Sequence, residues 1–147
     1  MRPHGKWHRG FDIGSPTGTP VHAAVNGTLS YARDPNGWGL FARIRFKAPA
    51  RSAAGTYEAG EELEFLYAHL LDDTPSLVMG QEKEVAAGTI VGRVGCSGNA
   101  RGMCSPSPES HVHVTLRTIK DRKQIDPGPL VGWTLRTPEQ GTLEPCP

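Results

Sequence analysis

The stretch SHVHVTLRT, residues 110–118, alternates polar with apolar side chains and is rich in β-branched residues. This pattern predicts a β-strand that buries one face. Side chains two residues apart point to the same face of a strand, so the imidazoles of His111 and His113 can converge on one point. Two unrelated surface histidines would give the same tripeptide. The pair therefore indicates a functional site only if other parts of the chain supply partners for it.

Four further stretches also predict strands. GLFARIRF (39–46) alternates regularly, whereas LEFLYAHL (63–70) and GTIVGRVG (88–95) are short apolar runs. TPVHAAVNGTLSYARD (19–34) predicts two strands joined by a turn at its Asn-Gly pair. Because the chain has 18 glycines and 13 prolines for turns and no long helical periodicity, we predict an all-β fold with mainly antiparallel strands.

Length and charge limit the domain organisation and the classes of partner. The 147 residues suit one compact domain, which we expect at 1–132, followed by a C-terminal arm at 133–147. The formal net charge of +1 gives no electrostatic reason to expect a nucleic acid or an anionic membrane as a partner. No apolar run is long enough to span a membrane, so none is expected to do so. The N-terminal MRPHGKWHRG lacks the apolar segment of a signal peptide, so no signal peptide is expected in this chain.

The chain has three cysteines, Cys96, Cys104 and Cys146. Cys96 and Cys104 bracket the short loop CSGNARGMC, and a disulfide between them would contribute about 2.5 kcal/mol of stability in the chain-entropy description. Three free thiols, a metal site, or a bridge from Cys146 to either of the others are the alternatives. We predict the Cys96–Cys104 bridge, which would fit an extracytoplasmic setting.

Two other parts of the chain carry residues that could act with the paired histidines. His8 and Asp12 are four residues apart, which puts them on one face of either a strand or a helix. The alternative is a turn in which Asp12 accepts backbone hydrogen bonds. His69 lies in the apolar run LEFLYAHL, where a buried histidine with only a structural role is the alternative. The two remaining histidines, His4 and His22, are interpreted as a loop residue and a structural residue.

Taken together, these groups favour a metal centre. Neutral imidazoles and a carboxylate, three or four in number, are the ligands that suit Zn²⁺. Three protein ligands with water in the fourth position make a hydrolytic site. Five candidates are available, two more than the metal needs, so the surplus histidines could serve as general acid, general base or oxyanion partner.

Nearly the whole chain is similar to a known family. It resembles the lysostaphin-like (LytM-type) zinc metallopeptidases, in which short elements follow one another in a fixed order. The matching elements here are HRGFD (8–12), GTPVHAAVNGTLSYA (18–32), GWGLFARIRF (37–46), LYAHL (66–70), VAAGTIVGRVGCSG (85–98) and HVH (111–113). Any one element is a weak signal, but the order and spacing match from about residue 7 to 127.

The resemblance implies a zinc endopeptidase that hydrolyses peptide cross-links of bacterial peptidoglycan through a metal-bound water. By position, it implies that His8, Asp12 and His113 bind one Zn²⁺ per chain. It implies that His69 and His111 act on the substrate as general base and oxyanion partner. The fold it implies is a narrow antiparallel β-sheet core with a groove walled by loops.

The same resemblance sets the expected partners and location. The substrate would be stem peptides or cross-bridges of peptidoglycan, both Gly-Gly bridges and D-Ala–diaminopimelate links remaining open. The chain would act outside the cytoplasm, in the periplasm, in the cell wall or secreted. The resemblance does not set the oligomeric state, for which we expect a monomer. The alternative is a catalytically silent module of the same fold that binds peptidoglycan or a protein partner.

The sequence departs from the family pattern in two ways. Thr115 stands where the family usually has glutamate two residues after the last histidine, so a supporting contact to that histidine is expected to be lost. The loops at 47–62 and before the His-x-His element are longer than usual, and both are expected to edge the groove. Loop 47–62 is mostly small residues, so we predict that it gates or widens the groove and does not support the core.

Overall fold

A computed structural model describes residues 11–14, 16–53, 55–71, 79–96, 111–126, 130 and 143–145, and for 11–14, 111 and 143–145 the description is of the backbone. Strands make up nearly all of the regular structure in these ranges. They are β1 (Phe11–Gly14), β2 (Pro20–His22), β3 (Gly27–Asp34), β4 (Gly39–Lys47), β5 (Glu62–Leu70), β6 (Lys83–Val85), β7 (Ile90–Arg93), β8 (His111–Thr118), β9 (Gln124–Ile125) and β10 (Leu143–Pro145).

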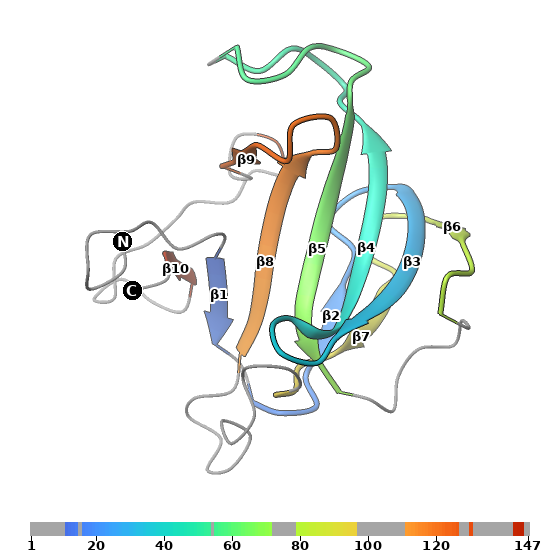
Figure 1. Ribbon diagram of the computed structural model, residues 1–147, viewed down its shortest axis with the longest axis vertical. Coiled ribbons are helices and arrows are strands. Elements are labelled where there is room, and N and C mark those ends of the chain that lie inside the picture. Colours follow the sequence, from blue (N-terminus) through green and yellow to red (C-terminus); the bar gives the residue numbers. More distant parts are fainter. Residues whose placement is uncertain are drawn as a thin grey trace.

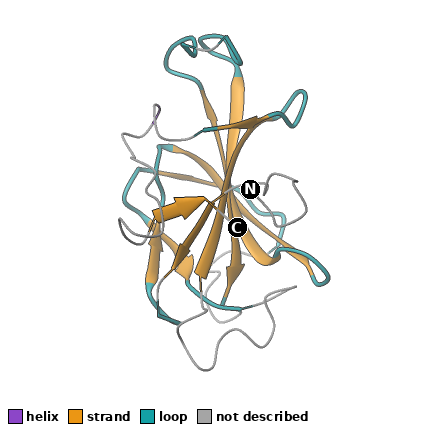
Figure 2. Cartoon of the chain, turned by 90° about the vertical axis from the view of Figure 1, so that its left-hand side faces the viewer, coloured by secondary structure: helices purple, strands orange, loops and turns teal. Residues whose placement is uncertain are grey.

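The strands form one large and one small antiparallel sheet. The large sheet has the order β10-β1-β8-β5-β4-β3-β6, with β9 paired to β8, and the small sheet consists of β2 and β7 (Figure 1). Seen from the side, the strands fan out, which is the twist expected of a sheet this wide (Figure 2). The predicted all-β, antiparallel fold is confirmed. In the described ranges, no helix is long and apolar enough to cross a membrane.

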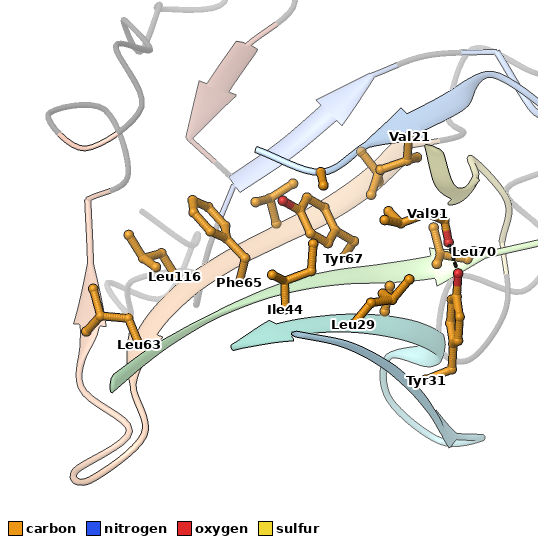
Figure 3. Close-up of a cluster of buried hydrophobic side chains, with 14 of the residues drawn as sticks. Val21, Leu29, Tyr31, Ile44, Leu63, Phe65, Tyr67, Leu70, Val91 and Leu116 are labelled. Atoms are coloured by element: carbon orange, nitrogen blue, oxygen red, sulfur yellow. Dashed lines mark hydrogen bonds between the residues drawn. The ribbon is translucent and has the colours of Figure 1, made fainter. Parts of the chain in front are cut away.

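The hydrophobic core lies along the large sheet, and Val21 and Val91 of the small sheet belong to it (Figure 3). Two tyrosine hydroxyl groups connect the layers inside it. Tyr31 Oη of β3 donates to the Val91 carbonyl of β7 at 2.6 Å, and Tyr67 Oη of β5 accepts the Ala24 N–H at 3.0 Å. Burial raises the pKa of both phenols above the ordinary 10.0, and for Tyr67 the backbone hydrogen bond offsets part of that rise.

Glycines of the GTIVGRVG stretch allow β7 and the residues after it to approach the end of β5. A Cβ atom on Gly92 would lie 2.8 Å from Leu70 Cδ1, and one on Gly95 would lie 2.6 Å from the backbone nitrogen of Leu71. Real Cβ atoms do not come that close to other heavy atoms, so larger residues would push the small sheet away from the large one.

The two strands predicted on either side of Asn26-Gly27 are present, but they do not pair with each other across the predicted turn. The strands on either side of this pair belong to different sheets, because β2 pairs with β7 and β3 pairs with β4 and β6. Asn26 Oδ1 accepts the N–H of Ala87 at 2.7 Å, so its side chain holds a neighbouring loop. Gly27 begins β3 beside the carbonyl of Arg45, where a Cβ atom would come within 2.4 Å of that oxygen. Close packing of backbones therefore accounts for this glycine.

The prediction that loop 47–62 gates or widens the groove is wrong. The loop joins β4 to β5 at the start of β5, whereas His69 lies at the other end of that strand, about 23 Å away by the rise of seven strand residues. The two ends are at opposite extremes of the sheet in Figure 1. Ala48 and Tyr57 of this loop are buried in the core, and the Ser52 side chain accepts the N–H of Thr56. The loop therefore supports the core, mainly through one aromatic residue.

Candidate active site

Strand pairing brings residues from three strands into one row. β8 lies between β1 and β5, and His113 is directly opposite Asp12 of β1 and Ala68 of β5. His111 is opposite Gly14, one step further along the same side of β8. Residues that are directly opposite in a sheet share a face, so Asp12, His111 and His113 have registers that place them on one face. The predicted grouping of these three residues agrees with the strand register.

Regular alternation directs His113 away from the hydrophobic core. Its neighbours Val112 and Val114 belong to the core, so His113 and Thr115 face the other side of the sheet. His113 keeps only 5% of its surface exposed. Its Nε2 is hydrogen-bonded to Thr115 Oγ1 at 3.1 Å, and the pair is buried. The ring is therefore held in one orientation by a partner on its own strand.

His69 reaches the same face by breaking the alternation of β5. Tyr67 faces the core, so an uninterrupted strand would turn His69 toward the core as well. Instead Leu40 of β4 pairs with Leu70, and Ala42 pairs with Tyr67, so one β4 residue faces two residues of β5. This β-bulge puts His69 in the left-handed region with φ of 62°, and its N–H donates to the Trp38 carbonyl at 2.8 Å.

The bulge brings the two buried histidines together. The ring centroids of His69 and His113 are 6.1 Å apart, with an angle of 67° between the ring planes. His69, like His113, keeps 5% of its surface exposed. A left-handed conformation costs a residue other than glycine roughly 1–2 kcal/mol. Strain of this kind is typical of functional sites, where the surrounding structure holds a side chain in place.

The donor set of this row suits a zinc ion. Among the side chains that the structure describes, no three His, Cys, Asp or Glu residues lie close enough to hold a metal. Of the three expected ligands, His8 lies outside the described residues, and Asp12 is described only by its backbone. His113 uses Nε2 for its hydrogen bond to Thr115, and an imidazole can bind a metal through either ring nitrogen. Imidazole and carboxylate from neighbouring strands are the ligand types that Zn²⁺ prefers.

Residues 6–127 match the family model described as Peptidase family M23. The chain belongs to peptidase family M23. Among curated relatives of this M23 chain is the DD-carboxypeptidase/endopeptidase Mpg of Neisseria meningitidis serogroup B, which is 29% identical over 132 residues. The match covers 90% of this chain but only 24% of Mpg, so the chain spans about a quarter of that relative's length.

Solved structures give the same assignment for the M23 fold. A mutant of the catalytic domain of the prophage-encoded M23 protein EnpA from Enterococcus faecalis is 29% identical and superposes with a TM-score of 0.58, covering 86% of this chain and 82% of that domain. The catalytic domain of the antimicrobial peptidase lysostaphin from Staphylococcus simulans is 23% identical, with a TM-score of 0.57 and coverage of 86% and 80%. The resemblance to lysostaphin-like peptidases and the predicted fold are confirmed.

The expected loss of a contact at Thr115 is wrong for this M23 chain. A threonine hydroxyl occupies the place of the usual carboxylate and still meets the His113 ring. The spacing could have indicated this contact, because residues 113 and 115 share a strand face. Trp38, which binds the backbone of His69, was missed, since no sequence pattern reveals a tertiary contact to a strained residue.

Cys96 forms a disulfide, so the alternative of three free thiols is wrong. Cys104 and Cys146 both lie outside the described residues, and the prediction that Cys104 is the partner remains a prediction. Cys96 directly follows Gly95, which packs against the backbone of Leu71 just beyond the bulge. The disulfide therefore begins close to the end of β5 that carries His69.

Proposed function

We propose that this chain is a zinc-dependent endopeptidase that hydrolyses peptide bonds of bacterial peptidoglycan. The observation that carries the proposal is the meeting of His69 and His113, two buried imidazoles 6.1 Å apart, in the row that also contains Asp12. Membership of a peptidase family supports the reaction class. The name of the relative Mpg, a DD-carboxypeptidase/endopeptidase, supports a peptide as the substrate.

In the proposed site, His8, Asp12 and His113 would hold the ion. A bound Zn²⁺ would supply Lewis acidity, lowering the pKa of water and polarising the scissile carbonyl. The hydrogen bond between His113 and Thr115 is compatible with ligation of the ion through Nδ1. A neutral imidazole that ligates through Nδ1 carries its proton on Nε2 and donates it to Thr115 Oγ1. Thr115 therefore orients the ligand ring without adding charge.

His69 is proposed to take the proton of the attacking water, since its ring already faces that of His113 and imidazole titrates near neutral pH. His111, one step along the same face of β8, is proposed to donate to the developing oxyanion. The bulge keeps His69 fixed before substrate arrives, which lowers the entropy cost of positioning it. We propose that the site operates in an extracytoplasmic compartment, in keeping with the disulfide at Cys96.

The test combines metal analysis with product analysis. Purified protein should contain about one zinc per chain by atomic absorption, and should release peptide fragments from purified peptidoglycan that mass spectrometry can assign. Chelation should stop release, and added Zn²⁺ should restore it. A protein that takes up no zinc and releases no fragment, yet still sediments with peptidoglycan, would be a silent binding module instead.

A further inference from the structure

The face that carries the two histidines continues into a cluster of charges. Moving along the paired strands from His113, the next residues on this face are Thr115 and then Arg117, and Glu64 of β5 is directly opposite Arg117. The Glu64 carboxylate is almost fully buried, with 3% of the residue exposed. A buried carboxylate requires charged partners, and two arginines supply them.

The two arginines hold opposite oxygens of Glu64. Arg117 Nε donates to Oε1 at 2.6 Å, and Arg43 Nε of β4 lies 2.6 Å from Oε2. The Arg43 contact is an ion pair that is not aligned as a hydrogen bond, so its Nε is a buried donor without a hydrogen-bond partner among the described residues. Counting only these described side chains, two guanidinium groups against one carboxylate leave the cluster with one uncompensated positive charge.

Trp38 connects the cluster to the histidines. The Arg117 Cζ atom lies 5.3 Å from the centroid of the Trp38 ring, and the carbonyl of the same tryptophan accepts the His69 N–H at 2.8 Å. The Trp38 ring is braced edge-to-face against Phe41, with centroids 5.3 Å apart. The indole therefore packs against one guanidinium group, while the backbone of the same residue binds the residue proposed to act as general base.

Both arginines retain surface that a ligand can reach. The Arg43 and Arg117 side chains are 39% and 21% exposed, and each contacts Glu64 through Nε. A guanidinium carries five N–H donors, so the Nη edges are suited to a second, bidentate carboxylate. The Cα atoms of His113 and Arg117 are about 13 Å apart, the length of about four residues of extended peptide.

From this placement we infer a carboxylate-binding subsite formed by Arg43 and Arg117, with Glu64 and Trp38 holding the guanidinium groups in place. The inference rests on the proposed function and narrows its substrate class. A stem peptide with free carboxylates near the cleaved bond would neutralise the uncompensated charge, whereas an uncharged oligoglycine bridge would not. The subsite therefore favours an anionic stem peptide as the substrate.

The test uses two synthetic stem-peptide dimers that differ only in whether their carboxylates are free or amidated. Wild-type protein should hydrolyse the free acid with a kcat/KM roughly tenfold or more above that of the amide. Arg117→Gln should reduce this preference to within about twofold, chiefly by slowing hydrolysis of the acid. The matched control is Arg51→Gln, in the loop between β4 and β5, whose side chain is 68% exposed and paired with Glu58. It should keep the wild-type preference.

Loss of Arg117 alone leaves Glu64 short of a partner and can unfold the protein. A triple variant, Arg43→Gln with Glu64→Gln and Arg117→Gln, removes all three charges together, and it should also lose the preference. The ratio of the two substrates does not depend on the folded fraction, so partial unfolding does not mimic the effect. Equal hydrolysis of acid and amide by wild-type protein, or an equal loss on both in Arg117→Gln, would overturn the subsite.

Calorimetric binding of the same two peptides separates the subsite from the proposed function. If the protein hydrolyses neither peptide but binds the acid more tightly, and Arg117→Gln removes that difference, then the subsite stands and the peptidase proposal fails. If the protein binds the acid and the amide equally, the subsite is refuted whether or not the protein hydrolyses them.

Discussion

Two strands bring a histidine to the same face of one sheet, and they do so in different ways. β8 places His113 there by regular alternation, with Val112 and Val114 in the core on either side. β5 places His69 there by interrupting its alternation with a bulge and a φ of 62°. The first arrangement follows from sequence periodicity and costs no backbone strain. The second depends on Trp38, the residue before β4, whose carbonyl accepts the His69 N–H.

The difference separates the two proposed roles. A metal ligand has to be fixed relative to other ligands, and the middle of a regular strand, hydrogen-bonded on both sides, achieves this. A general base has to reach over that ion from outside the ligand row. At the end of β5 the bulge turns the chain, so that the His69 side chain reaches this row instead of pointing into the core.

The largest expected effect distinguishes the two histidines by their metal content. His113→Ala should lower zinc affinity by orders of magnitude and abolish hydrolysis, because one of three proposed protein ligands is gone. His69→Ala should keep about one zinc per chain and lose roughly 10²–10⁴ in rate. Zinc by atomic absorption and hydrolysis of a stem peptide measure the two effects.

The control for both is His22→Ala. This exposed histidine on β2 contacts the Gly88 carbonyl at 3.0 Å and should affect neither zinc content nor rate. Following the same roles, His8→Ala and Asp12→Ala should resemble His113→Ala, and His111→Ala should resemble His69→Ala. If His111→Ala loses zinc while His113→Ala retains it, the roles of this pair are reversed.

A smaller effect is expected at Thr115, the partner of His113. Thr115→Val keeps the shape and removes the hydroxyl, so Nε2 of His113 loses its hydrogen bond. Zinc affinity should fall about 10- to 100-fold, as it does when such supporting contacts are removed. Competition with a chromogenic chelator measures this. Thr118→Val, at a buried threonine further along β8, is the control and should leave zinc affinity unchanged.

The sequence predicts how β8 delivers His113, but it does not predict how β5 delivers His69. Alternation predicts β4 and β8 and places His111 and His113 on one face. The bulge at His69 has no signal of its own in LEFLYAHL, because a left-handed histidine is stabilised by Trp38 across the sheet. For the same reason the motif order, rather than any periodicity, indicates that His69 belongs to the site.

The predictions for Asn26-Gly27 and for loop 47–62 fail for the same physical reason. Asn26-Gly27 has the composition of a hairpin turn, but the chain leaves β2 for another sheet. The composition of loop 47–62 conceals that Tyr57 anchors it in the core. Long-range packing determines each of these features, and local sequence does not report it.

Tyr67 is the last residue of β5 that pairs regularly with β4 before the bulge. Tyr67→Phe removes the acceptor of the Ala24 N–H, so at neutral pH unfolding free energy should fall by about 1–2 kcal/mol. Burial raises the pKa of Tyr67 in the folded state above the ordinary 10.0, so this phenol stabilises the fold fully below pH 10. That contribution is lost as the pH rises further toward the folded-state pKa. Urea titrations should therefore show the two proteins converging above pH 10, and a constant gap would contradict this.

The smallest expected effect is the difference in stability between the glycine and alanine variants at each of the two histidines. It tests most directly how β5 and β8 deliver their histidines, because its sign should reverse between His69 and His113. At His69, with φ of 62°, glycine avoids a left-handed cost of roughly 1–2 kcal/mol that alanine bears. Glycine also loses about 0.5–1 kcal/mol more than alanine through backbone entropy. His69→Gly should therefore be more stable than His69→Ala by about 0.5–1 kcal/mol. In the regular part of β8 only the entropy difference applies, so His113→Gly should be less stable than His113→Ala by a similar amount.

Urea unfolding of the four variants in the presence of chelator, which removes any contribution from bound metal, measures both differences. If glycine is the less stable substitution at both positions, the backbone at His69 is not held in the left-handed region, and the proposed route by which β5 delivers its histidine is wrong.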